Sequence, residues 1–334
     1  MSLQKTETPY QRRHNSRRDA DVTELVARAR EGQARAVARL ISLVEDASPK
    51  LREVAGALVG LAGHAQIIGL TGSPGVGKST TTTELVTAFR TAGKRVGVLA
   101  VDPSSPFSGG ALLGDRVRMQ EHALDPDVFI RSMATRGHLG GLAWATPQAL
   151  RVLDAAGCDV VLIETVGVGQ AEVEIAQLAD STMVLLAPGM GDGIQAAKAG
   201  ILEVADLYVV NKADRDGAQQ TVRDLRYMLS LGGRHSDAGA WRPPILSTVA
   251  SRGEGIGDVV SALDKHRHWL DHSGERARRQ QARAAAEIEA IAVATLRERM
   301  GDVHGSAALG RLAERVVAGE IDPYAAADAL VEEL

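Results

Sequence analysis

A chain of 334 residues is long enough for one large α/β domain with helical additions. Its formal net charge is −4, so the chain lacks the overall positive charge that is typical of nucleic-acid-binding proteins. Its single cysteine excludes a disulfide framework and a cysteine-based zinc site. No apolar run approaches the ~18 residues of a membrane span, and the N-terminus lacks the apolar core of a signal peptide, so we expect a cytoplasmic protein.

The N-terminal part of the chain divides into a tail and a helical extension. Residues 1–20 are polar and contain a cluster of arginines, which predicts a disordered basic tail. From 21 to 64 apolar residues recur at helical spacing, which predicts a helix over 22–45 broken at Gly32 and a second helix over 48–61. We expect this extension to pack on the domain that follows.

Between residues 65 and 272 short apolar runs alternate with helical periodicity. Strands are expected at 66–71, 95–101, 127–133, 159–164, 181–187, 207–211 and 244–248, and helices at 79–90, 142–156, 194–205, 217–231 and 256–271. Such continuous apolar strands are typical of an α/β fold with a mainly parallel sheet covered on both faces. Ligands of such a sheet bind at the carboxyl ends of its strands, so the polar residues there are the candidates.

Residues 273–334 are rich in charged helix formers. They predict a long helix to about Met300, then shorter helices over 306–318 and 323–333. The long helix carries an apolar stripe that must be buried somewhere, either on its own domain or against a second chain; the stripe contains Ile288, Ile291, Leu296 and Met300. We favour a homodimerisation arm because the helix is long and terminal.

The stretch from Gly72 to Ser79 is a complete G-x-x-x-x-G-K-[ST] phosphate-binding loop between an expected strand and an expected helix. Glycines let consecutive backbone N–H groups turn inward around a β-phosphate. Lys78 is expected to reach the β- and γ-phosphates, and the Ser79 hydroxyl to ligate Mg²⁺. The nucleotide-binding set also includes Gly72, Ser73, Pro74, Gly75, Val76, Gly77 and Thr80. The alternative, a glycine-rich turn that happens to end in Lys-Ser, is disfavoured by the strand–loop–helix context.

Asn211-Lys212-Ala213-Asp214 ends a later strand and matches the N-K-x-D motif that reads guanine in GTPases. The Asp214 carboxylate can accept hydrogen bonds from guanine N1–H and N2–H₂, a pair that adenine lacks, which favours GTP over ATP. Asn211 is expected to brace this loop and the Lys212 stem to cover the base. The last strand leads into the segment Ser247, Thr248, Val249 and Ala250, where GTPases place a backbone N–H against guanine O6.

Three carboxylates are candidates for the magnesium site. Glu164 ends a strand and precedes Gly167, in the Walker B and switch II arrangement in which the Gly167 N–H meets the γ-phosphate. Asp102 ends another strand, and Asp115 lies on the loop that follows it. Magnesium prefers oxygen ligands and keeps several waters, so these groups suit it directly or through water. For each of them a helix cap or a surface charge is the alternative.

Two further residues have simpler interpretations than catalysis. We expect His138 to pack its loop or to take part in switching rather than to act as a general base, because GTP hydrolysis depends mainly on positioning and charge stabilisation. Cys158 is expected to be a small buried apolar residue.

Several stretches together identify a family. The phosphate loop, Val-Asp-Pro-Ser-Ser at 101–105, Gly-Gly-Ala-Leu-Leu-Gly-Asp-Arg at 109–116, Arg-Gly-His-Leu-Gly-Gly-Leu at 136–142 and Glu-Thr-Val-Gly-Val-Gly-Gln at 164–170 resemble the MeaB/ArgK/MMAA GTPases, which are SIMIBI-class P-loop NTPases. The resemblance covers about residues 20–334.

The resemblance implies a GTPase chaperone that binds an adenosylcobalamin-dependent acyl-CoA mutase, gates cofactor loading, and protects or rescues the mutase. It also implies a homodimer through C-terminal helices. A third switch is implied at 188–198, where Lys198 would couple partner binding to hydrolysis, with catalytic roles for Lys78, Glu164 and Asp102. Gly193 stands where the family commonly has glutamate, so this chain lacks that side chain for any contact to the partner or to switch II. The chain lacks an Asp-x-His-x-x-Gly motif, so cobalamin would belong to the partner.

Two other functions remain open. One is a kinase of an arginine/ornithine transport system, a label the family has carried under the name ArgK, which requires an ATP preference. The other is a nickel-type metallochaperone GTPase, which requires clusters of cysteine and histidine.

Overall fold

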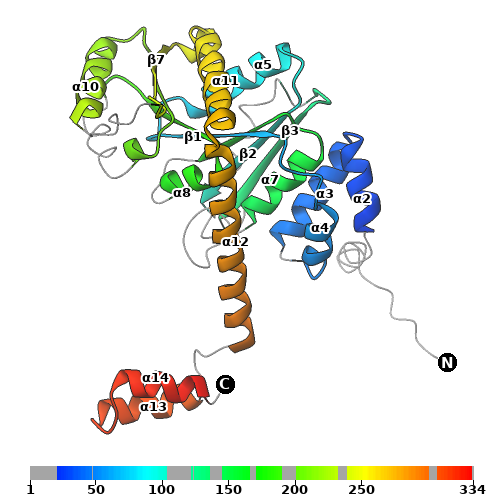
Figure 1. The fold of residues 1–334 in the computed structure, drawn as a ribbon, viewed down its shortest axis with the longest axis vertical. Coiled ribbons are helices and arrows are strands. Elements are labelled where there is room, and N and C mark those ends of the chain that lie inside the picture. The colour runs from blue at the N-terminus through cyan, green and yellow to red at the C-terminus, as the bar shows by residue number, and fades with distance from the viewer. Residues whose placement is uncertain are drawn as a thin grey trace, which may run out of the picture. The chain divides into compact units, whose positions relative to one another are not determined.

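The computed structural model describes residues 21–46, 48–103, 122, 124–135, 145–165, 171–189, 201–231, 239–300 and 307–332. The chain forms two compact units, Met1–Arg276 and Ala277–Leu334. The first unit contains a helical extension and a sheet with helices on both faces (Figure 1). The predicted basic tail lies outside the described residues, and the predicted domain boundaries stay predictions.

The extension consists of α2 (Val22–Arg30), α3 (Ala34–Glu45) and α4 (Leu51–Ala57). Gly32 takes a φ of 81° between α2 and α3, at the predicted break. The extension shares one apolar core with the sheet, because α3 packs on α7 (Thr146–Ala155). The α4 helix ends at Ala57, short of the predicted end at 61, since the chain turns at Gly60 with a φ of 76°.

The sheet has seven strands, all parallel to their neighbours, in the order β3-β2-β4-β1-β5-β6-β7. They are β1 (Gln66–Thr71), β2 (Val96–Pro103), β3 (Val128–Thr135), β4 (Val160–Thr165), β5 (Ser181–Leu186), β6 (Leu207–Asn211) and β7 (Ile245–Thr248). Every residue of β4, β5 and β6 is buried, as expected of central strands covered on both faces. The predicted α/β fold is confirmed.

Helices cover the two faces of the sheet. On one face α5 (Lys78–Thr91) and α11 (Ile256–Ser273) pack over Ile68 and Leu162, and on the other α7 and α8 (Ala171–Leu178) pack over Val161 and Ile163. Figure 1 shows these layers, with α10 (Ala218–Leu231) beside β6. The α8 helix was not predicted. Of the helix predicted over 194–205, the described part holds the short 3-10 turn η2 (Ile201–Glu203).

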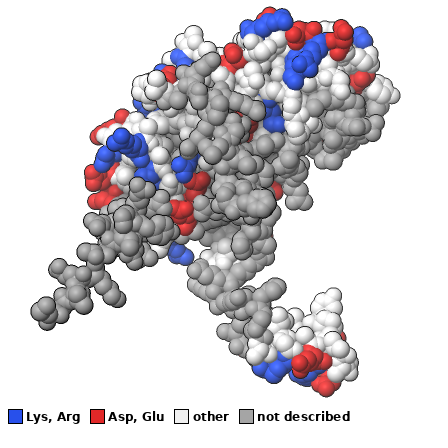
Figure 2. All heavy atoms as spheres, turned by 180° about the vertical axis from the view of Figure 1, so that it is seen from behind, with Lys and Arg blue, Asp and Glu red and all other residues white. Residues whose placement is uncertain are grey.

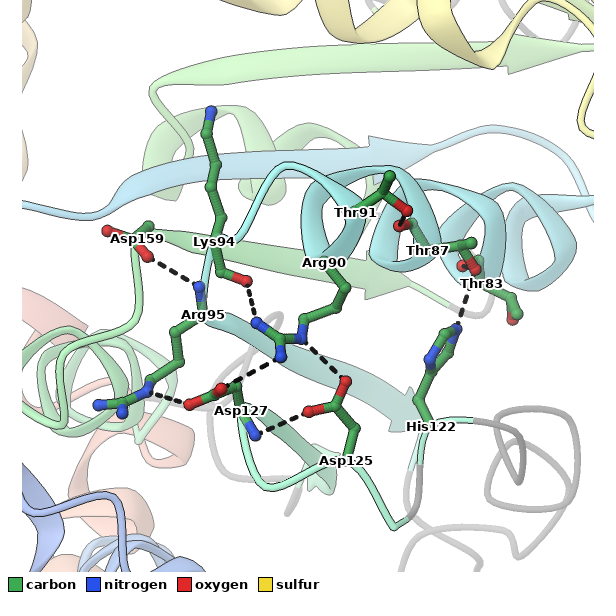
Figure 3. Close-up of polar contacts among 10 residues, drawn as sticks. All are labelled: Thr83, Thr87, Arg90, Thr91, Lys94, Arg95, His122, Asp125, Asp127 and Asp159. Atoms are coloured by element: carbon green, nitrogen blue, oxygen red, sulfur yellow. Dashed lines mark hydrogen bonds and ion pairs between the residues drawn. The ribbon is translucent and has the colours of Figure 1, made fainter.

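The C-terminal end of α5 is tied to the amino ends of three strands (Figure 3). Arg90 at this end lies 2.9 Å from the Asp125 carboxylate and 3.1 Å from that of Asp127. Arg95, just before β2, lies 3.0 Å from Asp127, and its backbone N–H donates to Asp159, just before β4. The hydrogen bond from Arg90 holds the pKa of Asp125 below its ordinary value. We call these residues the ion-pair cluster.

The second unit contains most of α12 (Glu275–Met300), together with α13 (Ala307–Val317) and α14 (Pro323–Glu332). The last two helices pack on each other and bury Leu312 and Ala326. Along α12, Ile288 is 68% exposed and Leu296 is 58% exposed, so these members of the predicted apolar stripe face solvent in a single chain. Among the described helices, α12 included, none combines the length and apolar character that crossing a membrane requires.

Charged side chains are mixed on the surface. Figure 2 shows lysine and arginine beside aspartate and glutamate on the described part of one face of the molecule. This distribution agrees with the small net charge of −4.

Candidate nucleotide-binding site

The predicted phosphate loop lies at the carboxyl edge of the sheet, between β1 and α5. Strand β4 is the direct neighbour of β1, and Leu70 pairs with Glu164 in register. The chain therefore brings the end of β4 beside the phosphate loop, although the two are far apart in sequence. On the other side, β5, β6 and β7 bring Asn211 and Thr248 to the same edge.

Two loop positions cannot accept a side chain. Gly72 has a φ of 139°, and a Cβ there would lie 2.3 Å from the carbonyl oxygen of Leu185. Gly77 has a φ of 99°, and a Cβ there would lie 2.3 Å from Nδ2 of Asn211. The loop thus lies against the β5 backbone at Gly72 and against the Asn211 side chain at Gly77, and glycine suits both the positive φ and the close approach.

Lys78 is the first residue of α5, and it is 7% exposed. Its Nζ donates to the carbonyl oxygens of Gly72 at 2.7 Å and Ser73 at 3.2 Å. The side chain therefore lies across its own loop, where two backbone carbonyls accept hydrogen bonds from the ammonium group. A phosphate is a stronger acceptor than a carbonyl because it is ionised.

A carboxylate and two hydroxyls meet beneath the loop. Glu164, 4% exposed, accepts from the Ser79 hydroxyl at Oε1 over 2.6 Å. Its Oε2 accepts from the Thr82 hydroxyl over 2.9 Å. The structure thus joins Ser79 and Glu164, which were predicted separately as magnesium groups. Thr82 was not predicted, although its position three residues after Ser79 places it on the same side of the helix.

Asn211 connects three segments at the edge of the sheet. Its Nδ2 donates to the carbonyl oxygen of Val76 over 2.9 Å. Its Oδ1 accepts from the Thr248 hydroxyl at 3.2 Å and from the backbone N–H of Ala250 at 3.0 Å. Asn211 is 3% exposed, so these bonds are shielded from water. The phosphate loop, the end of β6 and the turn after β7 are therefore fixed relative to one another.

The rest of the Asn-Lys-Ala-Asp stretch lies at the surface. Lys212 has a φ of 58°, which is unusual for a residue with a Cβ, and its Nζ donates to the carbonyl oxygen of Gly75 over 2.6 Å. Asp214 forms an ion pair with Arg252, in which Oδ2 and Nη2 are 3.1 Å apart. Arg252 belongs to the short turn η3 (Ala250–Arg252) after β7 and was not predicted.

Some predicted residues lie outside the described part of the chain. They are Asp115, Gly167, Lys198, Gly193 and His138. Asp102 is in β2 at the carboxyl edge, but its side chain is not described. Cys158 is buried as predicted, and burial raises the pKa of its thiol to about 12.

Comparison with known proteins gives concordant results. The family model for the methylmalonyl Co-A mutase-associated GTPase MeaB matches residues 37–304. A Pyrococcus abyssi protein named as a GTPase is 47% identical over 316 residues, covering 94% of this chain and 97% of that protein. The mouse methylmalonic aciduria type A homolog is 38% identical over 267 residues, covering 75% of this chain and 64% of that protein. The solved structure of a LAO/AO transport system kinase has a TM-score of 0.68 and 28% identity, covering 94% of this chain and 97% of that one.

Proposed function

The chain belongs to the MeaB family of GTPases, and we propose that its GTPase cycle serves an adenosylcobalamin-dependent acyl-CoA mutase. In this role it acts as a chaperone that gates cofactor loading and protects or rescues the mutase. The observation that carries the proposal is the match of the mutase-associated family model over residues 37–304. The mutase partner, the metal and the roles of individual residues are parts of the proposal.

Phosphate binding falls to Lys78 and the backbone N–H groups of the loop. When a triphosphate enters, Lys78 exchanges the carbonyl oxygens of Gly72 and Ser73 for ionised phosphate oxygens, which form stronger hydrogen bonds. The N-terminal N–H groups of α5 add donors and the positive end of the helix dipole. Ser73, Pro74, Val76 and Thr80 complete the loop's contact set.

The residues present fit a magnesium ion. Ser79 and Glu164 supply oxygen donors only, buried together at 2.6 Å, which is the donor chemistry that Mg²⁺ prefers. Ser79 would hold the ion, with Glu164, Asp102 and Asp115 as carboxylates acting directly or through water. The bound ion supplies neutralisation of the charge that develops on the β- and γ-phosphate oxygens. Glu164 then serves as the acceptor that orients the Ser79 hydroxyl.

Guanine reading falls to Asp214, with Lys212 covering the base and the segment 247–250 lining the O6 side. Support comes from Asn211, whose bonds to Val76, Thr248 and Ala250 hold the base loop and phosphate loop together. An Asp214→Asn substitution tests this assignment, because the amide offers a donor where xanthine has an oxygen. GTP affinity should fall and XTP affinity should rise, while Asp216→Asn in the same loop should change neither.

Switching and assembly complete the proposal. Release of the γ-phosphate would free the segments 102–118, 167–172 and 189–198, with Gly167 and Lys198 as the groups that sense it. The exposed apolar stripe of α12, with Ile288 at 68% exposure, supports a homodimer formed through the C-terminal helices. Cobalamin stays with the mutase.

The deciding experiment is GTP turnover by the pure protein, alone and with each adenosylcobalamin-dependent mutase of the same genome. Stimulation by one mutase, lost in Lys198→Ala, is the expected result and identifies the partner. Absence of stimulation by every mutase, with GTP binding intact, would contradict the chaperone role while leaving the GTPase activity in place.

A second candidate has one specific observation in its favour. The similar solved structure is named as a LAO/AO transport system kinase. A kinase of this kind would transfer the γ-phosphate to a transport protein. Incubation of that protein with ATP or GTP labelled in the γ-phosphate tests this directly, and label that appears only as free phosphate would exclude it.

A further inference from the structure

Helix α5 contains a run of threonines that local preference does not explain. Residues 80–83 are all threonine, and each disfavours the helix by roughly 0.5 kcal/mol relative to alanine. Thr81 and Thr82 are fully buried, where a hydroxyl needs a hydrogen-bond partner. Thr81 satisfies its hydroxyl on the Gly77 carbonyl one turn back, whereas Thr82 also contacts a residue of another element.

The hydroxyl of Thr82 has one hydrogen and two nearby acceptors. The carbonyl oxygen of Lys78 lies at 3.0 Å, and Oε2 of Glu164 lies at 2.9 Å. An ionised carboxylate is a stronger acceptor than a backbone carbonyl, so the hydrogen belongs with Glu164. The Lys78 carbonyl is the alternative acceptor for the same hydrogen, as is usual for a helical threonine.

Both oxygens of the Glu164 carboxylate are then held from one helix. The Ser79 hydroxyl donates to Oε1 over 2.6 Å, and the Thr82 hydroxyl donates to Oε2 over 2.9 Å. A carboxylate held at one oxygen can still turn about its terminal bond, which is a soft rotation. Holding the second oxygen removes that freedom. The plane of the Glu164 carboxylate is thus fixed by two residues that lie one turn apart.

We infer that Thr82 is a positioning residue for the magnesium site, acting through Glu164. The inference rests on the proposed function, in which Ser79 holds the ion and Glu164 supports it. With a metal on Ser79, the Thr82 hydroxyl would still hold Oε2 of Glu164 and help to keep the carboxylate facing the site. Groups that orient metal-binding residues in this way typically change metal affinity about 10- to 100-fold when removed.

The test compares three variants in the full-length protein. Thr82→Val keeps the shape of the side chain and removes the hydroxyl, whereas Thr82→Ser keeps the hydroxyl. Thr81→Val is the matched control, because Thr81 is equally buried and bonds the carbonyl oxygen of Gly77 over 3.0 Å without contacting Glu164. The measurement is the release rate of a fluorescent GDP analogue as a function of free Mg²⁺.

We expect Thr82→Val to need about 10-fold more free Mg²⁺ for half-maximal retention of GDP. Thr82→Ser and Thr81→Val should stay close to the wild type, and all four proteins should release GDP at similar rates in excess EDTA. A purely structural role would lower thermal stability in Thr82→Val without moving the Mg²⁺ midpoint. Rescue by serine separates the hydroxyl from the packing.

Three results would overturn the inference in distinguishable ways. A wild-type protein that retains GDP in a Mg²⁺-dependent manner, with an unmoved midpoint in Thr82→Val, would reject the role of Thr82 alone. A wild-type protein whose GDP release ignores Mg²⁺ would reject the proposed metal site and the role of Thr82 with it. An equal change in EDTA and in Mg²⁺ would assign Thr82 to nucleotide binding instead.

Discussion

The two ends of α5 lie at opposite edges of the same sheet and are built from different contacts. At its C-terminal end, Arg90 is paired with Asp125 and Asp127, as Figure 3 shows. At its N-terminal end, Lys78 donates to backbone carbonyls and Glu164 accepts from hydroxyls. At the C-terminal end the described contacts join opposite charges, whereas at the N-terminal end they include backbone carbonyls and hydroxyls.

The difference follows from what each end must do. An ion pair within the protein stabilises the fold, but exchanging it for a ligand would leave a partner unpaired. A carbonyl or a hydroxyl group that gives up a charged partner loses less free energy than a charged group does. A phosphate or a metal can therefore replace it as the partner. The helix is thus anchored at one end and, in the proposed function, binds its ligand at the other.

The largest expected effect concerns the reactivity of the Cys158 thiol. Cys158 lies just before β4, at the edge of the sheet where the C-terminal end of α5 is anchored. Burial raises the pKa of its thiol to about 12 from an ordinary value of 9.0, which lowers the thiolate fraction about 1000-fold near neutral pH. We therefore expect native protein to resist alkylation by iodoacetamide and denatured protein to react fully. Rapid reaction of the native thiol would show that this edge opens readily to solvent.

The next largest effect is expected at the phosphate loop. Gly72→Ala places a Cβ 2.3 Å from the carbonyl oxygen of Leu185 at a φ of 139°, so the loop must move. A shift of about 1 Å in such a site lowers GTP turnover about 100-fold. Gly56→Ala in α4 is the control, because a Cβ there meets nothing within 4 Å. Wild-type turnover in Gly72→Ala would mean that the loop does not bind phosphate.

A smaller effect, on stability alone, is expected at the ion-pair cluster. The pKa of Asp125 is lowered, so its carboxylate stabilises the fold above the pKa of the unfolded chain, and this stabilisation disappears as pH falls through the folded pKa. Asp125→Asn should lower the free energy of unfolding by about 1 kcal/mol at neutral pH, because the pair is partly exposed.

Urea unfolding across a pH series checks this expectation. The gap between Asp125→Asn and wild type should close below about pH 4, and GTP affinity should stay unchanged throughout. Asp216→Asn is a control at an exposed site. A loss of GTP affinity in Asp125→Asn would show that the contacts at the two ends of α5 depend on each other.

The smallest effect is expected for the ion pair at the loop proposed to read guanine. The Arg252 and Asp214 side chains are 58% and 35% exposed, and exposed pairs contribute little. Arg252→Ala should weaken GTP binding by no more than about threefold, and the difference should vanish at high salt. A large effect that persists at high salt would mean that Arg252 contacts the nucleotide itself.

The sequence predicts most of the elements and the ligand, but not the contacts between distant segments. The seven strands were predicted because continuous apolar runs bounded by polar residues are typical of buried parallel strands. The α8 helix was missed because it is short and follows a glycine-containing stretch. The strand order that brings Glu164 beside Ser79 depends on tertiary packing, which periodicity does not contain.

The same limit applies to individual side chains at the site. Lys78 and Asp214 were recognisable because they belong to motifs with fixed spacing. Thr82 and Arg252 lie outside those motifs, and their partners are remote in sequence, so only the structure identifies them.

The backbone at Lys212 implies a trade between stability and activity. Its φ of 58° costs roughly 1 kcal/mol for a residue with a Cβ, and glycine would remove that cost. Glycine would also remove the Nζ that reaches the carbonyl oxygen of Gly75. Lys212→Gly would therefore give a protein that is harder to unfold and poorer at holding its nucleotide, so selection for thermal stability alone would erode the site at this position.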